Sequence, residues 1–279
     1  MPVAVITDST ACLPEQVAAQ WGVTTVQLQI RANGRVDDEN RFERTELVET
    51  LRAGNTVSTS PPDPGAFFWT YQDAVSAGAD AIVSLHISRK LSATADAARE
   101  AAQQVRVPVY VLDSTTTSMS LGFAALSAAR AAAAGAGPQR VMQIADRRYR
   151  ASSELLYVDT LEYLRRGGRI GAASALLGSA MAIKPLLTVR DGEVAPLSKV
   201  PGSKRAIAKL TDLAVARAGE RPVDIAVACV TPSDRELTVV QRLRERVPRL
   251  NDIMLVHAST VITAHVGPGA LGITVAPVP

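Results

Sequence analysis

The segment at residues 56–65, TVSTSPPDPG, offers mainly hydroxyl groups for chemistry. It contains Thr56, Ser58, Thr59 and Ser60, together with three prolines. Neutral hydroxyls can donate hydrogen bonds to an anion without pairing it with a fixed charge. Proline removes backbone freedom that binding would otherwise have to freeze. The residue types therefore predict a preorganised turn that binds an anionic group.

Polar side chains also follow the short apolar runs of the first half. The runs at 3–9, 80–88 and 107–114 (VAVITDS, DAIVSLHIS and VPVYVLDS) are typical of buried strands, and the Ala-rich stretches between them favour helices. In a parallel sheet covered by helices, ligands bind beyond the carboxyl ends of the strands. The residues at or just past these ends are Asp8, Ser9, Ser88, Ser92, Asp113 and Ser114.

Two interpretations of these strand ends remain open. Asp8 and Asp113, with Arg169 from the second half, could form the polar site of an enzyme that acts on a small phosphorylated or carboxylated metabolite. Asp and Ser are also frequent caps of a following helix, which is a purely structural role. The shape of the cavity separates the functions: a short polar cleft supports an enzyme, and a long apolar tunnel supports a carrier.

The histidines are interpreted from their neighbours. His86 and His257 lie inside apolar strand-like runs and are expected to be structural, and no Ser-His-Asp or Cys-His arrangement is apparent. His265 precedes the segment GPGALG, so its imidazole either donates to an anion from a rigid turn or is an ordinary surface histidine. The glycines of that segment match a dinucleotide-binding loop in spacing but lack its strand-helix context, so they predict a tight turn.

The most informative stretch is LEYLRRGGRIGAASALLGSAMAIKPLL, at residues 161–187. Its pattern predicts a short helix over 161–166 that ends at Gly-Gly, and a second helix from about Ile170 until Pro185 breaks it. The second helix is apolar nearly all round, so it is either buried in a core or lines a slot for a slender apolar ligand. Arg169 would lie at the mouth of that slot, and one face of the helix carries Ile170, Ala173, Leu177 and Met181.

Composition limits the class of protein. The chain has 279 residues, 47% hydrophobic and 20% charged, as in a globular protein of one large or two ordinary domains. With 30 Lys and Arg against 27 Asp and Glu, and 4% aromatic residues, nucleic acid is not an expected partner. Cys12 and Cys229 have no metal-ligand spacing, so neither a disulfide nor a metal site is expected. No leader or long apolar segment is evident, and we expect a cytoplasmic protein.

The two halves of the chain differ in pattern and predict two domains, with a boundary near residue 152. Strand-helix alternation in residues 1–152 predicts a parallel sheet covered on both faces. In residues 153–279, an Asp-Gly turn between two apolar-polar runs predicts a hairpin, and the strand and helix patterns that follow predict a mixed α+β domain. The Ala- and Arg-rich stretch at 124–151 is expected to be an ordinary helix surface.

Seven motifs occur in the order and spacing of one family. They are VAVITDSTACLP, VSTSPPDP, ISRKLSATADAA, VYVLDSTTTSMSLG, YLRRGGRI, IKPLLTVRDGEV and HVGPGALG. Over essentially its whole length the chain resembles the DegV family of bacterial fatty-acid-binding proteins. The resemblance implies a two-domain α/β fold, with an N-terminal α/β/α layer domain that has a parallel sheet, a C-terminal α+β domain that has a largely antiparallel sheet, and the ligand between them.

The same resemblance implies a carrier rather than an enzyme, without catalytic residues, cofactor or metal. Family members hold one long-chain fatty acid and present its carboxylate to a separate ATP-dependent fatty acid kinase, which forms the acyl-phosphate for phospholipid synthesis. Partners are thus a fatty acid, that kinase and, transiently, a membrane surface. Matched by position, the residues that bind the carboxylate are Thr59, Ser60, Ser92, Arg169 and His265, and the slot face described above would hold the acyl chain.

Two motifs depart from the family pattern. TSPPD stands where TSQPS is commoner, and LSATA stands where LSGTY is commoner. The missing glycine and tyrosine change the local shape of the pocket, and with it the preferred acyl chain. Arg165 and Arg166 are expected to be solvated and to face the kinase.

Overall fold

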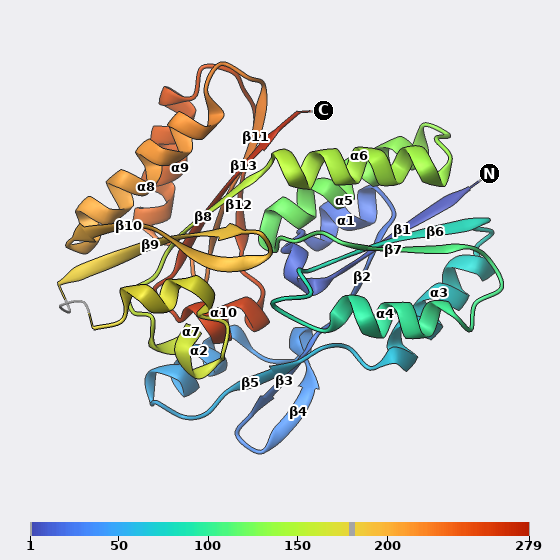
Figure 1. Cartoon of the computed structure of the whole chain (residues 1–279), viewed down its shortest axis with the longest axis horizontal. Coiled ribbons are helices and arrows are strands. Elements are labelled where there is room, and N and C mark those ends of the chain that lie inside the picture. The colour runs from blue at the N-terminus through green and yellow to red at the C-terminus, as the bar shows by residue number, and fades with distance from the viewer. Residues whose placement is uncertain (1, 179–181, 279) are drawn as a thin grey trace.

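The computed structural model describes residues 2–178 and 182–278, which form three sheets and the helices around them (Figure 1). The first sheet is parallel throughout, and its three longer strands confirm the strands predicted in the first half. Its strand order is β2 (Val23–Val26), β1 (Val3–Asp8), β6 (Ala81–His86) and β7 (Val109–Asp113).

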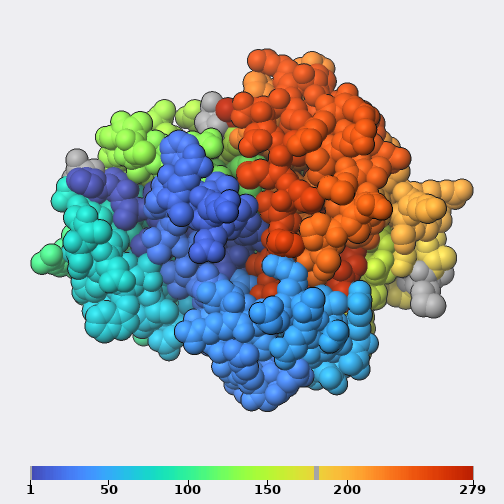
Figure 2. Space-filling model, turned by 180° about the vertical axis from the view of Figure 1, so that it is seen from behind, coloured from blue at the N-terminus to red at the C-terminus, as the bar shows by residue number. Residues whose placement is uncertain are grey.

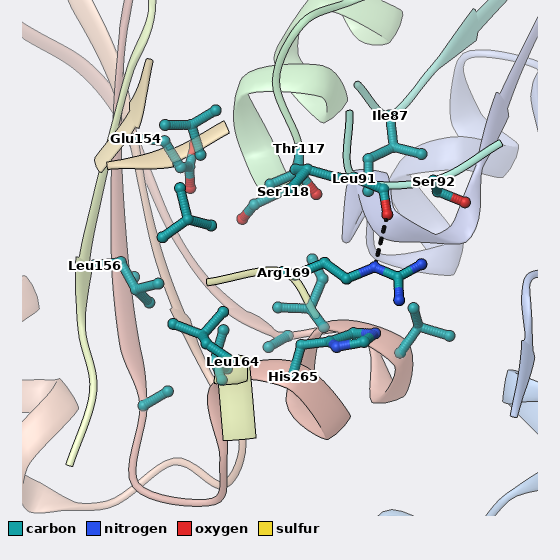
Figure 3. Close-up of a pocket in the computed structure, with 18 of the residues that line it drawn as sticks. Ile87, Leu91, Ser92, Thr117, Ser118, Glu154, Leu156, Leu164, Arg169 and His265 are labelled. Atoms are coloured by element: carbon teal, nitrogen blue, oxygen red, sulfur yellow. Dashed lines mark hydrogen bonds between the residues drawn. The ribbon is translucent and has the colours of Figure 1, made fainter. Parts of the chain in front are cut away.

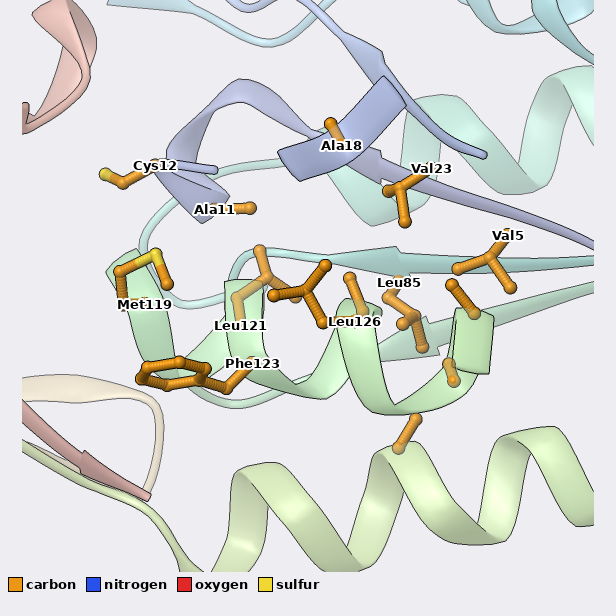
Figure 4. Packing of buried hydrophobic residues seen from close by; sticks show 14 of the residues in the cluster. Val5, Ala11, Cys12, Ala18, Val23, Leu85, Met119, Leu121, Phe123 and Leu126 are labelled. Atoms are coloured by element: carbon orange, nitrogen blue, oxygen red, sulfur yellow. The ribbon is translucent and has the colours of Figure 1, made fainter. Parts of the chain in front are cut away.

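Helices cover both faces of this sheet, because alternate residues of each strand point to opposite sides. Ile6 and Ile82 pack against α3 (Pro64–Ser76) and α4 (Thr94–Ala102). Val5 and Leu85 pack on the other side, and Figure 4 shows Leu85 beside Leu121 and Leu126 of the helix that covers this face. The helices on this second face are α1 (Glu15–Gln20), α5 (Ser118–Ala133) and α6 (Pro138–Ala151).

The second sheet is largely antiparallel, and only β11 and β12 run parallel among its described pairs. The predicted hairpin is confirmed: it turns at Asp191 and Gly192, whose φ values are 51° and 83°. α8 (Ser203–Ala218) and α9 (Asp234–Arg246) cover one face. The strand order is β10 (Glu193–Pro201), β9 (Ile183–Arg190), β8 (Ser153–Tyr157), β13 (Leu271–Pro277), β11 (Val223–Cys229) and β12 (Leu250–His257).

α5 lies between the two large sheets and is buried on all sides over most of its length. Its small residues allow this close packing: a Cβ on Gly122 would lie 2.5 Å from the carbonyl oxygen of Ala11. The expectation that 124–151 is an ordinary helix surface is therefore wrong for α5. A helix of small side chains can be covered on every face, so its alanine content does not reveal its exposure.

The third sheet was not predicted, and it changes the interpretation of the hydroxyl-rich segment. Ser58, Thr59 and Ser60 form a strand that pairs with residues 29–31, so this part of the segment is a strand and not a turn. α2 (Arg44–Arg52) and α10 (Thr260–Val266) pack against this sheet. Its strands are β4 (Arg35–Asp38), β3 (Gln29–Ala32) and β5 (Ser58–Ser60), and the remaining short elements are α7 (Glu162–Arg166) and the 3-10 helices η1 (Ser9–Ala11), η2 (Glu39–Arg41) and η3 (Gly171–Leu176).

The predicted boundary near residue 152 falls between α6 and β8. The first and third sheets use only residues before it, and the six-stranded sheet uses only residues after it. Both parts also share one hydrophobic cluster, and a buried ion pair joins Arg148 of α6 to Asp224 of β11. Figure 2 shows the two parts, blue to green and orange to red, packed against each other. The domain boundary therefore stays a prediction.

Candidate ligand-binding site

An apolar cavity lies between the six-stranded sheet, the start of α5, the loop after β6 and α10 (Figure 3). It has about 980 Å³ of atom-free space, including the part open to solvent. Aliphatic side chains make up most of the wall: Leu28, Ile87, Leu91, Leu156, Leu164, Val189, Val194, Val261, Ile262, Val266 and Ala270. Such a wall favours an apolar ligand.

Polar side chains from both halves of the chain meet on this lining. Thr59 Oγ1 on β5 and His265 Nε2 on α10 are 2.8 Å apart. Figure 3 shows Arg169 above His265, and Ser92 on the loop that carries Leu91. Ser60 is the most exposed of the set. We call this part of the cavity the arginine end, defined as Thr59, Ser60, Ser92, Arg169 and His265.

His265 is uncharged at neutral pH. Burial, and to a smaller extent the positive charge of Arg169, lowers the pKa of His265 to about 4. Its Nδ1 is buried and has no hydrogen-bond partner among the described residues. A neutral imidazole carries one proton, so Nε2 either donates to Thr59 or accepts from it. With the proton on Nε2, the hydroxyl proton of Thr59 is available to a ligand.

Arg169 is fixed by backbone carbonyl groups. Its Nε donates to the oxygen of Leu91 at 3.0 Å, and its Nη1 donates to the oxygen of Gly167 at 2.7 Å. Within the described residues it forms no ion pair with an Asp or Glu. Its charge is therefore available to an anionic ligand, and charge-assisted hydrogen bonds to a carboxylate are stronger than neutral ones.

Ser92 lies in a turn that connects β6 to α4. The amide groups of Leu91 and Ser92 both donate to the carbonyl oxygen of Ser88, which shapes the turn. Ser88 Oγ donates to the oxygen of Gly192 at 2.7 Å and so ties this turn to the β9-β10 hairpin. Ser92 Oγ lies 2.8 Å from Thr94 Oγ1, at the positive end of the α4 dipole. The arginine end thus combines hydroxyl groups, a neutral imidazole and one cation, which suits a carboxylate.

Sequence comparison identifies the family of the chain. Residues 2–278 match the family described as "Uncharacterised protein, DegV family". A DegV domain-containing protein of Streptomyces coelicolor is 46% identical over 274 residues, which are 98% of each chain.

This chain belongs to the DegV family.

Solved DegV structures have the same fold over the full length of the chain. A DegV family protein from Thermus thermophilus, described for its fatty acid binding, has a TM-score of 0.94 and 30% identity, with 100% of each chain covered. DegV from Bacillus subtilis, described as a fatty acid binding protein, has a TM-score of 0.89 and 27% identity, also with 100% of each chain covered. The predicted α/β fold class, with one parallel and one largely antiparallel sheet, is confirmed.

The glycines of two DegV motifs allow close packing around His265. A Cβ on Gly167 of YLRRGGRI would lie 2.1 Å from His265 Nδ1. A Cβ on Gly267, which has a φ of 86°, would lie 2.4 Å from a ring carbon of Tyr163. Gly267 ends α10 and leads into the turn before β13, so GPGALG is the predicted tight turn and not a dinucleotide-binding loop. These contacts bring α7 against α10.

The predicted second helix in this DegV chain is wrong. A 3-10 helix ends at Leu176, and Pro185 lies within β9. Gly171 and Gly178 have φ values of 49° and 78°, which an α-helix does not accept.

The side chains assigned to the acyl slot do not share one face of a helix. Ala173 is buried behind the cavity wall, in a cluster with the lining residues Leu164 and Val194, and Leu177 is 47% exposed. Ile170 packs partly against the same cluster. None of Ile170, Ala173 and Leu177 lies on the cavity lining, and Met181 lies outside the described residues.

The sequence analysis missed the residues at the other end of the cavity. We call it the glutamate end, defined as Thr117, Ser118 and Glu154, all on the lining. Alternation in β8, whose sequence is SELLY, is the signal that could have found this end. It places Glu154 and Leu156 on the cavity face of the strand. Leu155 and Tyr157 point the other way, into the core beneath α8 and α9.

The carboxylates of Asp8 and Asp113, at the ends of β1 and β7, suggested an enzyme, but both are hydrogen-bonded to backbone amides. Asp8 accepts hydrogen bonds from the amides of Thr10 and Ile87, and Asp113 accepts from the amides of Arg89 and Thr115. Neither carboxylate lies on the cavity lining. Asp8 caps η1, as the capping interpretation predicts, whereas Asp113 binds loop amides and caps no helix, because the N-cap of α5 is Thr117.

A Ser-His-Asp chain exists in the structure although none was apparent in the sequence. His86 Nδ1 lies 3.1 Å from Asp8 Oδ2, and His86 Nε2 lies 2.7 Å from Ser84 Oγ, which accepts from Tyr71. All four residues are fully buried. Because Ser84 has no access to a substrate, we assign the network to the core, as predicted for His86.

Arg165 and Arg166, next to the site, are exposed and pair with Glu162. Within the described residues, no group of three or more His, Cys, Asp or Glu side chains is placed to hold a metal ion. Both cysteines are buried and free. The described part of the chain has no helix with the length and apolar character needed to cross a membrane.

Proposed function

We propose that this DegV protein is a fatty-acid carrier that holds one long-chain fatty acid in the cavity and presents its carboxylate to a separate ATP-dependent fatty acid kinase. The observation that supports it most is a cation with hydroxyl donors at one end of a cavity whose wall is mostly aliphatic. The related structures from Thermus thermophilus and Bacillus subtilis are described as binding fatty acids.

The acyl chain supplies most of the affinity in this proposal. Burial of each methylene gains about 0.8 kcal/mol, so a chain of roughly 14 methylenes gains about 11 kcal/mol before ordering costs are subtracted. Leu156, Leu164 and Val261 lie on the wall that would receive it. The carboxylate then decides the orientation of the ligand more than its affinity.

The carboxylate lies among Thr59, Ser92, Arg169 and His265 in this proposal. A buried carboxylate is expensive unless it is hydrogen-bonded, and these groups supply neutral donors and one cation. Neutral donors leave carboxylate oxygen accessible for attack on phosphorus in a partner's active site. The kinase and transient contact with a membrane surface are inferred from the family resemblance, and a cytoplasmic location is part of the proposal.

Extraction of freshly purified protein tests the carrier function. Denatured protein extracted into organic solvent should yield about one fatty acid per chain by mass spectrometry, since the cavity described here is a single binding site. An empty extract, together with no measurable binding of added palmitate, would contradict the proposal.

The head-group assignment is tested by the double variant Thr59→Ala/Ser92→Ala. Removal of two hydroxyl donors should weaken palmitate binding by about 10- to 100-fold, at roughly 1 kcal/mol or more for each hydrogen bond. Thr70→Ala/Thr238→Ala is the matched control, because both hydroxyls bond only to their own helices, away from the cavity. Equal affinity of the two double variants would refute the assignment.

A further inference from the structure

A buried carboxyl group lies at the glutamate end of the cavity. Glu154 is 6% exposed and belongs to the cavity face of β8. Figure 3 shows it across the cavity from Arg169, His265 and Ser92, with Leu156 on the same side. An alkyl chain that starts at the arginine end and fills the cavity therefore approaches a carboxyl group.

Neutral hydroxyl groups hold this carboxyl. Ser120 Oγ donates to Glu154 Oε2 at 2.6 Å, and Thr274 Oγ1 donates to Oε1 at 2.8 Å. Within the described residues, no Lys, Arg or His side chain forms an ion pair with it. Burial raises the pKa of Glu154 to about 7, against the lowering effect of these hydroxyl donors. The Ser118 side chain and the Ser120 amide also donate to this carboxyl. In its protonated form the carboxyl carries one O–H group, which can donate to a ligand oxygen.

Thr117 carries a hydroxyl group without a partner. Its Oγ1 is buried and makes no hydrogen bond to any described residue. Although Thr117 is the N-cap of α5, its side chain makes no capping bond. Figure 3 shows Thr117 and Ser118 together on the cavity wall, between Glu154 and Leu91. A buried hydroxyl that stays unpaired costs about 1–3 kcal/mol.

A plain alkyl chain leaves Thr117 Oγ1 without a partner, and a chain with a hydroxyl at an intermediate position does not. A hydroxyl near the end of the chain provides an acceptor for the protonated carboxyl of Glu154. Sites built to hydrogen-bond a hydroxyl group discriminate strongly against the analogue that lacks it. The polar residues therefore act as selectivity groups, in addition to the apolar wall.

We propose that the cavity selects long-chain fatty acids that carry a hydroxyl group remote from the carboxylate, and that Glu154 and Thr117 recognise this hydroxyl. The inference rests on the proposed carrier function, because it assumes a carboxylate at the arginine end.

The test compares the affinities of the full, delipidated chain for stearate, 12-hydroxystearate and 18-hydroxystearate. At least one hydroxylated acid should bind about tenfold more tightly than stearate, as expected for one additional buried hydrogen bond. Thr117→Val, which is nearly isosteric, should remove a preference for the mid-chain hydroxyl. Glu154→Gln should reduce a preference for the terminal one.

Ser92→Ala provides the matched control. Of the proposed ligand contacts it removes only one to the carboxylate, so it should weaken binding of plain and hydroxylated acids by the same factor. Equal affinity of the wild type for all three acids would overturn this inference and leave the carrier function intact. A preference that survives in both Thr117→Val and Glu154→Gln would also overturn it. Failure of every acid to bind would instead overturn the carrier function.

Discussion

The arginine end and the glutamate end of the cavity differ in how they hold charge. At the arginine end, a guanidinium fixed by backbone carbonyls lies beside His265, whose pKa is lowered to about 4 by burial and by that same cation. At the glutamate end, burial raises the pKa of Glu154 to about 7, and its partners are hydroxyl groups. One end thus favours an anion, and the other favours a neutral hydrogen-bonding group.

This difference shows that one cavity can give direction to a ligand that is apolar for most of its length. Both ends avoid a tight internal ion pair, since neither Arg169 nor Glu154 pairs with an opposite charge among the described residues. The two ends also gain charge at opposite extremes of pH. His265 becomes positively charged in acid, whereas Glu154 becomes negatively charged in base.

The largest expected effect concerns Glu154. Its pKa is about 7 in the folded protein against the usual 4.5 of a glutamate, so the folded state binds the proton more tightly. The resulting stabilisation is complete below pH 4.5 and is lost as the pH rises through 7. Between pH 5 and pH 8 the wild type should lose up to about 3 kcal/mol more stability than Glu154→Gln. Urea unfolding at the two pH values measures this difference.

Glu100→Gln is the control for that measurement, because Glu100 is an exposed carboxyl on α4. It should keep the pH dependence of the wild type. If Glu154→Gln also keeps it, Glu154 does not titrate as described, and the contrast between the two ends is lost.

The next effect concerns Arg169, the only cation on the described lining of the cavity. Arg169→Leu removes the charge opposite the bound carboxylate and should weaken palmitate binding about 30-fold, which corresponds to about 2 kcal/mol. Arg166→Leu serves as the control, since Arg166 is exposed, pairs with Glu162 and does not line the cavity. A titration that gives both variants the wild-type affinity would refute the anion site.

The smallest effect concerns His265. Its folded pKa of about 4 lies below the usual 6.5 of a histidine, so the unfolded state binds the proton more tightly. The stabilisation is complete above pH 6.5 and is lost as the pH falls through 4. Because the ring is partly exposed, we expect about 1 kcal/mol less acid sensitivity in His265→Gln than in the wild type. His257→Gln, at an exposed position on β12, should keep the wild-type acid sensitivity.

Local patterns in the sequence were sufficient for much of the fold. Apolar runs predicted β1, β6 and β7, and the Asp191-Gly192 turn predicted the β9-β10 hairpin. Strands depend on the alternation of side chains, and tight turns depend on the φ angles of two or three residues. Both can therefore be predicted from a short stretch of sequence.

The failures occurred where pairing with distant residues decided the outcome. β5 is short and polar and becomes a strand only because β3 pairs with it. The apolar run after Arg169 looked helical, but Gly171 and Gly178 adopt left-handed φ angles there, and Ile183–Arg190 join the six-stranded sheet. Hydrophobic periodicity cannot distinguish a helix from a strand in such short segments, because it does not show which backbone groups will pair with a distant strand.

The sequence by itself determined the family, the main strands and the polar residues that match the family's carboxylate site. Only the tertiary structure decided that Thr59 contacts His265, 206 positions away, and that Glu154 faces a cavity. The reason is physical: local backbone preferences act over a few residues, whereas a binding cavity forms where elements distant in sequence pack together. Their side chains acquire common neighbours, and shifted pKa values, only after that packing.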